Sequence, residues 1–398
     1  MISVSDAERI ITAHVKDVGD SSCPLAEAQG RILRETIRAD RDYPPCDRST
    51  VDGIAIARAA VAAGQRSFRV EHTLQAGRPA RGLKDPAGGC IRIMTGAVVP
   101  PGIDRIIPVE HLTERCTIVH RSVRGAEGQN IHWRGSDGRK GDALLRPGCI
   151  LSGARIAVIA STGRKTVRVA RVPSIALIST GDELVDVGRP AKPWQIRCSN
   201  AYGIRATLLR NGYSGIAVFH VKDRRDEVRN VFAEALRAFD VVITTGGVSM
   251  GDFDFVPEVL RELKIRTLFH TVRQKPGKPF WFGVSRKHQP VFALPGNPVS
   301  SMVCLHRYVL PGLTHAMGLR SGPVLLATLS RSHAPHARLT LFLPVRIESK
   351  GGQRLAHPER YGGSGDLVAL GTSDGFIELP RGRRRLSAGA NVTYRAWT

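Results

Sequence analysis

The sequence predicts a multidomain α/β protein with a doubly wound parallel sheet at its centre, and three observations lead to this class. Apolar strand-like runs alternate with amphipathic helical segments between about residues 172 and 320. Short β-like runs broken by Gly and Pro precede this region and return after it. The chain is 398 residues long and 42% hydrophobic, which suffices for two to four domains with cores of their own.

The elements can be assigned in order along the chain. Ser5 and Glu8 have the spacing of a capping box, which predicts a helix at the N-terminus. Between about 40 and 140, an all-β module is predicted from FRVEHTL, GCIRIMTG, DRIIPVE and CTIVHRSV. The central region is predicted to form strands at SIALIST, IAVFHV, DVVITT, RTLFHTV and VFALPG, and helices at SNAYGIRATLLRNGY, RDEVRNVFAEALRAF, FVPEVLREL and from about residue 298. Beyond about 322, LTLFLPVRIES and DGFIELP predict a second set of β-strands.

Composition excludes several classes of protein. No stretch approaches the roughly 18 apolar residues of a membrane span, and the N-terminus lacks the basic and apolar parts of a signal peptide. A cytoplasmic protein without membrane contact is therefore expected. The 7 cysteines are scattered and form no CxxC pair, which favours buried free thiols over a disulfide framework or a zinc site.

The net charge of +23 attracts polyanions of any kind by long-range steering. The densest basic run, residues 381–385, is predicted to be a solvated loop. Because aromatic and basic residues are not interleaved in the chain, a nucleic-acid-binding protein is the least favoured class.

Loops that follow the strands of a doubly wound sheet meet at its carboxyl edge, where such sheets bind ligands. In this chain the loops are residues 179–183, 222–223, 244–254, 275–278 and 294–300. Gly246 and Gly247 would let backbone amides approach an anion, and Ser249 adds a hydroxyl. The last loop leads into a helix N-terminus, and Lys275 and Lys278 flank a Pro-Gly turn. This set predicts a site for phosphate or another extended anion.

Four carboxylates lie in or beside the same loops: Glu183, Asp223, Asp252 and Asp254. Carboxylates repel a phosphate unless a divalent cation lies between them, or unless they accept hydrogen bonds from the amide and amine edge of a pterin or guanine. Two functional interpretations therefore stay open, a metal site and a heterocycle site. In a third, structural interpretation, Asp252 or Asp254 caps the helix that follows.

Together these motifs resemble those of a known enzyme family. TTGGVSMGDFDF, STGDEL, KPGKPFWFG and LPGNPVSS are similar to motifs of the molybdopterin molybdenumtransferase family, MoeA, which the E domain of gephyrin also resembles. Three upstream segments extend the resemblance: PPCDRSTVDGIAI, IMTGAVVPPGIDRIIPVE and NIHWRGSDGRKGDALLRPG. The motifs follow the family's order from about residue 5 to 380, which makes the resemblance specific.

The resemblance implies a fold with four domains. They are an elongated helical N-terminal domain at 1–41 and 141–171, an inserted β domain at 42–140, an α/β molybdopterin-binding domain at 172–320 and a C-terminal β domain at 321–398. It also implies a homodimer in which Asp52, Thr95 and Asp137 of one subunit face the α/β crevice of the other.

The resemblance further implies the reaction and the residues that serve it. Members of the family join molybdate to the dithiolene of adenylylated molybdopterin, with Mg²⁺, and release AMP and molybdenum cofactor. The implied catalytic residues are Asp52, Glu183, Asp223, Asp254, Lys275 and Lys278, and the candidate Mg²⁺ ligands are Glu183, Asp223, Asp252 and Asp254. The implied substrate-binding residues are Thr95, Asp137, Thr180, Gly246, Gly247, Ser249, Pro295, Asn297, Ser300 and Ser364.

The expected partners are a second copy of the chain, a molybdopterin adenylyltransferase and molybdoenzyme chaperones. Val51 and Ile54 stand where the family has Met and Tyr, and Trp133 stands where a basic or polar residue is expected. Two alternatives share the α/β module. A molybdopterin adenylyltransferase usually has Gly-Gly-Thr-Gly where this chain has Gly-Gly-Val-Ser, and a gephyrin-like scaffold would keep the fold without catalysis.

Overall fold

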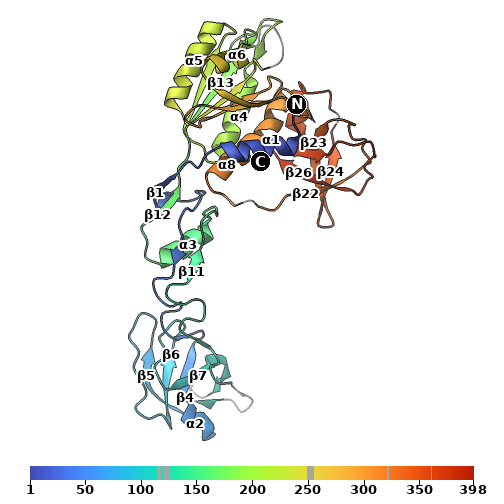
Figure 1. Cartoon of the computed structure of the whole chain (residues 1–398). Coiled ribbons are helices and arrows are strands. Elements are labelled where there is room, and N and C mark those ends of the chain that lie inside the picture. Colours follow the sequence, from blue (N-terminus) through green and yellow to red (C-terminus); the bar gives the residue numbers. More distant parts are fainter. Residues whose placement is uncertain (114–117, 120–125, 249–254, 321, 360) are drawn as a thin grey trace. The chain divides into compact units, whose positions relative to one another are not determined.

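The computed structural model describes residues 1–113, 118–119, 126–248, 255–320, 322–359 and 361–398, with the backbone alone at 61–62 (Figure 1). These residues form two compact units. The first comprises Met1–Arg34, Pro147–Leu151 and Val167–Thr398, and the second comprises Glu35–Arg146 and Ser152–Thr166. The four domains implied by the resemblance remain a prediction, because the two units have other boundaries. Within the described residues, every helix is too short or too polar to cross a membrane.

A six-stranded sheet forms the centre of the first unit. In spatial order its strands are β16 (Ile216–Val221), β13 (Ile175–Thr180), β17 (Val241–Thr245), β21 (Pro290–Leu294), β20 (Trp281–Val284) and β18 (Arg266–His270). The first four are parallel, as the alternation of strands and helices predicts. The prediction was wrong for the RTLFHTV strand, β18, which pairs antiparallel with β20. The short β20 follows β18 without a crossover helix, so the chain reverses direction there.

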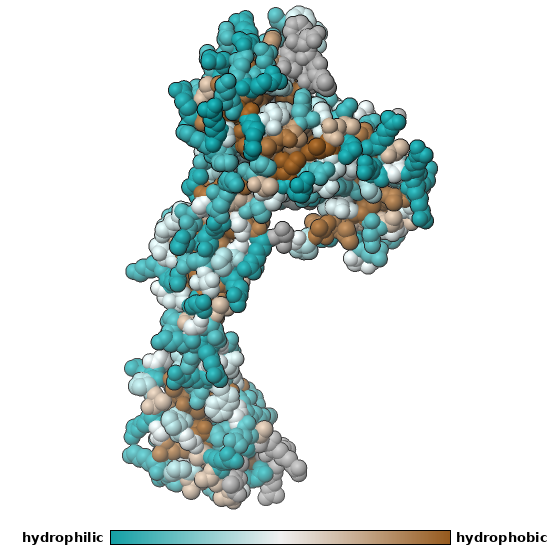
Figure 2. Space-filling view, viewed as in Figure 1, coloured by the Kyte–Doolittle hydropathy of each residue, from teal (hydrophilic) through white to brown (hydrophobic). Residues whose placement is uncertain are grey.

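Helices cover both faces of this sheet, which confirms a doubly wound architecture. One face packs against α1 (Val4–His14), α4 (Ser199–Arg210), α7 (Pro298–Cys304) and α8 (Leu310–Ala316), the last two joined by the π-helical turn Leu305–Val309. The other face packs against α5 (Arg225–Ala238) and α6 (Val256–Glu262). Successive strand residues serve opposite cores, Leu177 on the α4 side and Ile178 on the α5 side. Figure 2 shows hydrophilic side chains over α5, whose inner face buries Val228, Phe232 and Ala235.

The N-cap of the first helix lies two residues before the predicted one. Ser3 is its N-cap, and the Ser3 hydroxyl accepts a hydrogen bond from the Asp6 amide at 3.0 Å. Ser3 and Asp6 have the same spacing as Ser5 and Glu8, so the sequence pattern is compatible with an N-cap at either serine. The capping box at Ser5 was therefore wrong, because Glu8 instead forms an ion pair with Arg307 at 2.9 Å.

The second unit is built mainly from short strands, but the all-β prediction for residues 40–140 holds only in part, because a short helix and a 3-10 turn lie within that region. Its largest sheet contains β5 (Arg69–Leu74), β6 (Gly89–Ile93), β4 (Gly53–Ala57) and β7 (Ile103–Pro108). Three further pairs are β2 (Ile37–Arg38) with β11 (Ala143–Leu145), β3 (Arg48–Ser49) with β10 (Ile131–His132), and β8 (Leu112–Thr113) with β9 (Ile118–Val119). Its helical segments in the described part are α2 (Arg58–Ala62), α3 (Gly153–Ser161) and the 3-10 turn Val109–His111.

The C-terminal strands close into a ring. They are β22 (Leu326–Leu329), β23 (Thr340–Lys350), β24 (Gln353–Pro358), β25 (Gly375–Leu379) and β26 (Asn391–Ala396), with α9 (Leu367–Thr372) before β25. β23 pairs with both β24 and β25, which completes the ring, and β19 (Gln274–Lys275) adds to β23 in parallel. The remaining elements of the first unit are β1 (Asp20–Pro24), β12 (Thr166–Ala170), β14 (Leu184–Val185), β15 (Ile196–Arg197) and the 3-10 turn Leu25–Glu27.

Asp240 ties together the starts of two central strands. Its carboxylate accepts hydrogen bonds from two Arg171 nitrogens at 2.7 and 3.0 Å, and from the Ser174 amide and hydroxyl at 2.8 and 2.9 Å. The bond from the Arg171 guanidinium, supported by those from Ser174, holds the pKa of Asp240 below its ordinary value against the opposing effect of burial.

We expect Asp240→Asn to lower the free energy of unfolding by about 1 kcal/mol near neutral pH, because the pair is partly exposed and screened. The folded-state pKa is lowered, so this stabilisation is present above the unfolded-state pKa and is lost as pH falls through the folded-state pKa. Urea unfolding of both proteins between about pH 7 and pH 3 measures the difference. A gap that stays constant over this range would contradict the assignment.

Candidate active site

A cleft of about 530 Å³ lies at the carboxyl ends of β13 and β17. The sheet order reverses between these strands, since β16 and β17 lie on opposite sides of β13, and ligands bind at such a point in doubly wound sheets. Four predicted site residues line the cleft: Thr180, Glu183, Gly246 and Asn297. The structure therefore brings three of the predicted loops together, the loops after β13, β17 and β21.

Gly246 leaves very little space between the loop after β17 and the end of β13. Its φ is 94°, and a Cβ atom there would lie 2.5 Å from the Thr180 carbonyl oxygen and 3.0 Å from Thr180 Oγ1. That hydroxyl is buried and has no hydrogen-bond partner among the described residues. The Gly246 amide already donates to the Leu294 carbonyl at 3.2 Å, so it does not take part in the predicted anion nest. The Thr180 hydroxyl, like that of the neighbouring Ser179, is thus a buried oxygen beside the cleft without a partner among the described residues.

The loop before α7 brings Asn297 and Ser364 together. Asn297 Nδ2 donates to Ser364 Oγ at 2.8 Å, and the Val299 amide donates to the Ser364 carbonyl at 3.2 Å. Ser300 differs from the prediction, because it is only 2% exposed and faces the core from α7. The Pro295 carbonyl accepts from the Thr245 hydroxyl at 3.4 Å and so serves the loop itself.

Two residues of the cleft were missed by the sequence analysis. Asn200, at the start of α4, donates from Nδ2 to the Gly296 carbonyl at 2.6 Å and to Thr245 Oγ1 at 3.2 Å. Arg197 brings a cation to the lining. The predicted loop after β13 ended at Glu183. The segment IRCSN, residues 196–200, leads into the start of α4 and returns to the same edge of the sheet. Asn200 joins two of the loops, and Arg197 adds positive charge.

The Lys275–Lys278 turn lies against the beginning of α7. A Cβ atom on Gly277 would come within 3.6 Å of the Ser300 carbonyl, and Lys275 belongs to β19, which pairs with β23. Both lysines are exposed. Neither lines the cleft described above, so their convergence on one ligand remains a prediction.

Carboxylates of the metal hypothesis occupy the ends of neighbouring strands. Glu183 lines the cleft after β13, and Asp223 follows β16, where its amide donates to Asp182 Oδ1 at 3.3 Å. Ser249, Asp252 and Asp254, which were also predicted to belong to the site, lie outside the described residues. Among the residues that are described, no three His, Cys, Asp or Glu side chains converge as a metal-binding group.

In the second unit, Asp52 and Thr95 form one hydrogen-bonded pair. The Thr95 amide and hydroxyl both donate to Asp52 Oδ1, each at 2.7 Å. The hydroxyl and then the amide lower the pKa of Asp52, so the carboxylate stays ionised. Asp137 has a different partner, since its Oδ1 lies 2.8 Å from His132 Nε2.

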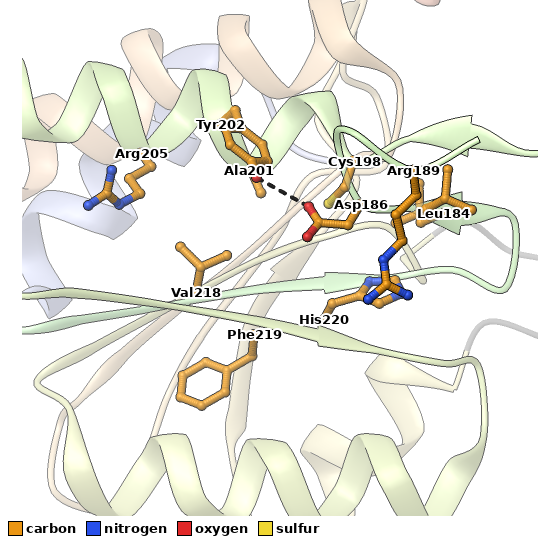
Figure 3. A pocket seen from close by; sticks show the side chains of 11 residues that line it. Leu184, Asp186, Arg189, Cys198, Ala201, Tyr202, Arg205, Val218, Phe219 and His220 are labelled. Carbon is orange, nitrogen blue, oxygen red and sulfur yellow. Dashed lines mark hydrogen bonds between the residues drawn. The ribbon is translucent and has the colours of Figure 1, made fainter. Parts of the chain in front are cut away.

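A second cavity, of about 700 Å³, shares Leu184 and Cys198 with the cleft. Figure 3 shows it between α4, which contributes Tyr202 and Arg205, and the edge strand β16, which contributes Val218. The Tyr202 hydroxyl donates to Asp186 Oδ1 at 3.2 Å. Tyr202 and Val218 are 52% and 46% exposed, so this cavity opens onto a partly apolar surface.

A cleft lined by hydroxyl and side-chain amide groups at the switch point of a doubly wound sheet defines the class of α/β proteins that bind ligands at the carboxyl ends of their strands. The chain belongs to the molybdopterin molybdenumtransferase family, whose members are transferases of molybdenum cofactor biosynthesis. Family models match it at residues 2–163 (MoeA N-terminal region, domain I and II), 176–315 (probable molybdopterin binding domain) and 327–397 (MoeA C-terminal region, domain IV).

Individual relatives agree with the family models. A molybdopterin molybdenumtransferase of Synechocystis sp. is 38% identical over 402 residues, covering 100% of both chains. One from Staphylococcus epidermidis is 33% identical and covers 98% of this chain and 94% of its own. The crystal structure of a molybdopterin biosynthesis MoeA protein from Pyrococcus horikosii matches with a TM-score of 0.80 and 29% identity, covering 100% of this chain and 99% of its own.

Proposed function

We propose that this chain inserts molybdate into adenylylated molybdopterin, with Mg²⁺, and releases AMP and molybdenum cofactor. The observation that carries the proposal is the cleft between β13 and β17. There, a buried Thr180 hydroxyl that has no hydrogen-bond partner in the described part of the chain faces close-packed glycine backbone. Such a corner suits a polar heterocycle or a phosphate oxygen, because either one would satisfy the hydroxyl.

Charged and neutral residues of the site would have different roles. Arg197, Lys275 and Lys278 supply positive charge for a pyrophosphate and for the molybdate dianion, whereas Thr180 and Asn297 supply hydrogen bonds. The reaction breaks the phosphoanhydride link to AMP when an oxygen of molybdate or of water attacks the phosphorus, and AMP leaves with the oxygen that it needs. The protein therefore mainly has to hold both anions and to neutralise the charge that develops. This chemistry requires no nucleophilic side chain.

The cleft offers the Glu183 carboxylate, and Mg²⁺ is commonly held by one or two carboxylates together with substrate phosphates. Glu183 and Asp223 would hold the ion together with Asp252 or Asp254, the latter two assigned from sequence alone. Bound there, Mg²⁺ would polarise the phosphate oxygens of the substrate.

A reconstituted assay tests the function. Purified protein is incubated with adenylylated molybdopterin, molybdate and Mg²⁺, and both AMP release and cofactor formation are followed. We expect both products to appear in step. A molybdopterin adenylyltransferase would instead consume ATP and molybdopterin, and a scaffold without catalytic activity would release no AMP.

We further propose a homodimer, with the site completed by Asp52, Thr95 and Asp137 of the partner subunit, and we retain the four-domain division given above. The surface beside α4 supports self-association. Six large apolar residues there or on the adjoining strands and loop are at least 40% exposed: Val187, Trp194, Ile196, Tyr202, Leu209 and Val218. Tyr202 and Val218 line the same cavity, and contiguous exposed apolar surface marks sites of protein association.

We expect Tyr202→Glu to shift the protein from dimer toward monomer and to lower activity in proportion, because it places a charge in the apolar contact. Analytical ultracentrifugation over a range of protein concentrations measures the shift. Val324→Glu is the control, since Val324 is 66% exposed but belongs to the segment before β22. A monomeric and fully active parent protein would contradict the dimer.

A further inference from the structure

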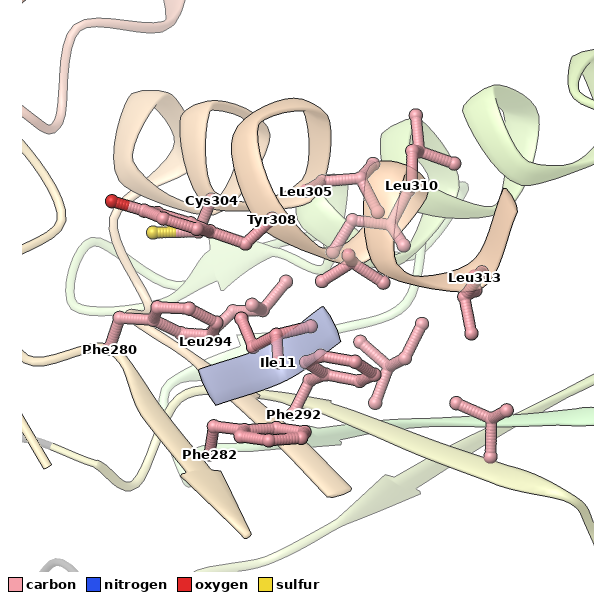
Figure 4. Close-up of a cluster of buried hydrophobic side chains, with 14 of the residues drawn as sticks. Ile11, Phe280, Phe282, Phe292, Leu294, Cys304, Leu305, Tyr308, Leu310 and Leu313 are labelled. Carbon is pink, nitrogen blue, oxygen red and sulfur yellow. The ribbon is translucent and has the colours of Figure 1, made fainter. Parts of the chain in front are cut away.

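Three buried side chains with polar atoms lie beneath the turn that contains Lys275 and Lys278. Gln274, Cys304 and Tyr308 are 0%, 0% and 1% exposed. Figure 4 shows Cys304 and Tyr308 on one side of their helix, pointing toward Phe280, whose ring stacks on that of Tyr308 with centroids 5.0 Å apart. Burying a glutamine in such apolar surroundings lowers the stability of the fold unless hydrogen bonds satisfy its amide.

Gln274 finds partners at both ends of its amide. The Tyr308 hydroxyl donates to Gln274 Oε1, and Gln274 Nε2 donates to the Gly277 carbonyl at 3.0 Å. Nε2 also lies 3.5 Å from Cys304 Sγ. Because Tyr308 supplies a donor to one end, it fixes which end of the amide faces Gly277.

The turn is in direct contact with the buried side chains of Gln274 and Cys304. Gly277 has a φ of 86°, and a Cβ atom there would lie 2.7 Å from Gln274 Nε2 and 2.9 Å from Cys304 Sγ. On the other side, the Val272 amide donates to the Lys278 carbonyl at 2.9 Å. The pairing of β19 with β23 holds Lys275 opposite Leu341. The backbone between the two lysines is thus held by Cys304 at the end of α7, by Val272 beyond the end of β18 and by the C-terminal ring.

We propose that Gln274 and Tyr308 are positioning residues, which hold the Gly277 carbonyl and thereby fix the two lysines for an oxyanion. This inference rests on the proposed function, in which Lys275 and Lys278 bind the anionic substrates. Neither Gln274 nor Tyr308 touches the ligand. Their contribution is preorganisation, since a turn that has to be ordered on binding loses affinity for the same contacts.

The test compares two tyrosines that each lose one buried hydroxyl. The Tyr308 hydroxyl donates to Gln274, whereas the Tyr213 hydroxyl is buried with no hydrogen-bond partner among the described residues. Molybdate is the probe, titrated by calorimetry without pterin, and thermal unfolding is measured in parallel. We expect Tyr308→Phe to weaken molybdate binding about fivefold, as for loss of one hydrogen bond, and Tyr213→Phe to leave it unchanged.

A double-mutant cycle separates positioning from general destabilisation. In a Lys275→Ala background, Tyr308→Phe should cause a smaller loss of molybdate affinity than in the parent protein, because one of the two lysines through which it acts is gone. If the single variant unfolds, Gln274→Met with Tyr308→Phe removes both partners and keeps an apolar fill, which is expected to fold and still to bind molybdate weakly.

The outcomes distinguish the two proposals. If Lys275→Ala weakens binding and Tyr308→Phe behaves like Tyr213→Phe, the positioning role is overturned and the proposed function stands. Losses that simply add in the cycle also overturn it. If Lys275→Ala leaves molybdate affinity unchanged, the turn is no part of the site, and the lysine role and the positioning role fall together.

Discussion

Replacing Glu183 with Gln is expected to slow AMP release on the order of a hundredfold while leaving the fold intact. The carboxylate lines the cleft at the end of β13, and Gln has nearly the same size without the charge. Under the proposed function this charge holds Mg²⁺ beside the pyrophosphate, so its loss removes stabilisation that the transition state needs. The rate is measured across a Mg²⁺ titration, and Mg²⁺ binding is measured by calorimetry.

Glu258→Gln is the matched control for this variant. Glu258 lies on α6 and pairs with Arg225 at the surface, at 3.4 Å, so its replacement should change neither rate nor Mg²⁺ affinity. If Glu183→Gln keeps the parental rate and the parental Mg²⁺ affinity, the ion is held elsewhere. Asp223→Asn and Asp254→Asn in the same assay would then locate it.

Much of the central fold follows from local sequence, because strands buried on both faces give continuous apolar runs that are easily recognised. The parallel pairing of the central strands and the presence of helices on both faces were predicted from such runs, whereas the spatial order of the strands was not. β20 is only four residues long and lies within a motif analysed for its lysines, so its antiparallel pairing was not predicted. The N-terminal cap was misplaced by two residues because two cap-like spacings overlap.

The candidate site was predicted best where a motif and its role lie in one loop. Thr180, Glu183, Gly246 and Asn297 line one cleft because each follows a central strand. Ser300 could not be assigned from the loop alone, since one helical turn decides whether a side chain faces ligand or core. Contacts between residues far apart in sequence could not be predicted from local patterns. One example is the hydrogen bond between Gln274 and Tyr308, which are 34 residues apart.

Asn200 is a residue of the cleft that local sequence patterns could not have identified. The residue stands outside the glycine-rich loops, yet its side chain bridges the loop after β21 and the end of β17. No spacing rule relates position 200 to position 296. Only the return of the chain to the carboxyl edge of the sheet brings them together, and this follows from the pairing of β14 with β15.

Two Gly→Ala substitutions in the first unit should have opposite effects on stability. Gly203 lies inside α4, where a Cβ atom would meet only Met302 Sδ at 3.7 Å, an ordinary contact. Gly203→Ala should stabilise the fold by about 0.5–1 kcal/mol, because Ala loses less conformational freedom than Gly in a helix. It should leave catalysis unchanged, which makes it the control for the cleft.

Gly246→Ala should instead cost on the order of 2–4 kcal/mol, since it combines a left-handed backbone with a contact to main-chain atoms. The added Cβ would lie 2.5 Å from the Thr180 carbonyl, so the loops after β13 and β17 must move apart. Because these loops form the cleft, affinity for the pterin nucleotide should fall at least tenfold even at temperatures where the variant is folded. Urea unfolding and calorimetric titration of the adenylylated pterin measure the two effects. If Gly246→Ala binds the nucleotide as tightly as Gly203→Ala does, the corner between Gly246 and Thr180 is not where the substrate binds, and the ligand has to be sought along the Arg197 side of the cleft.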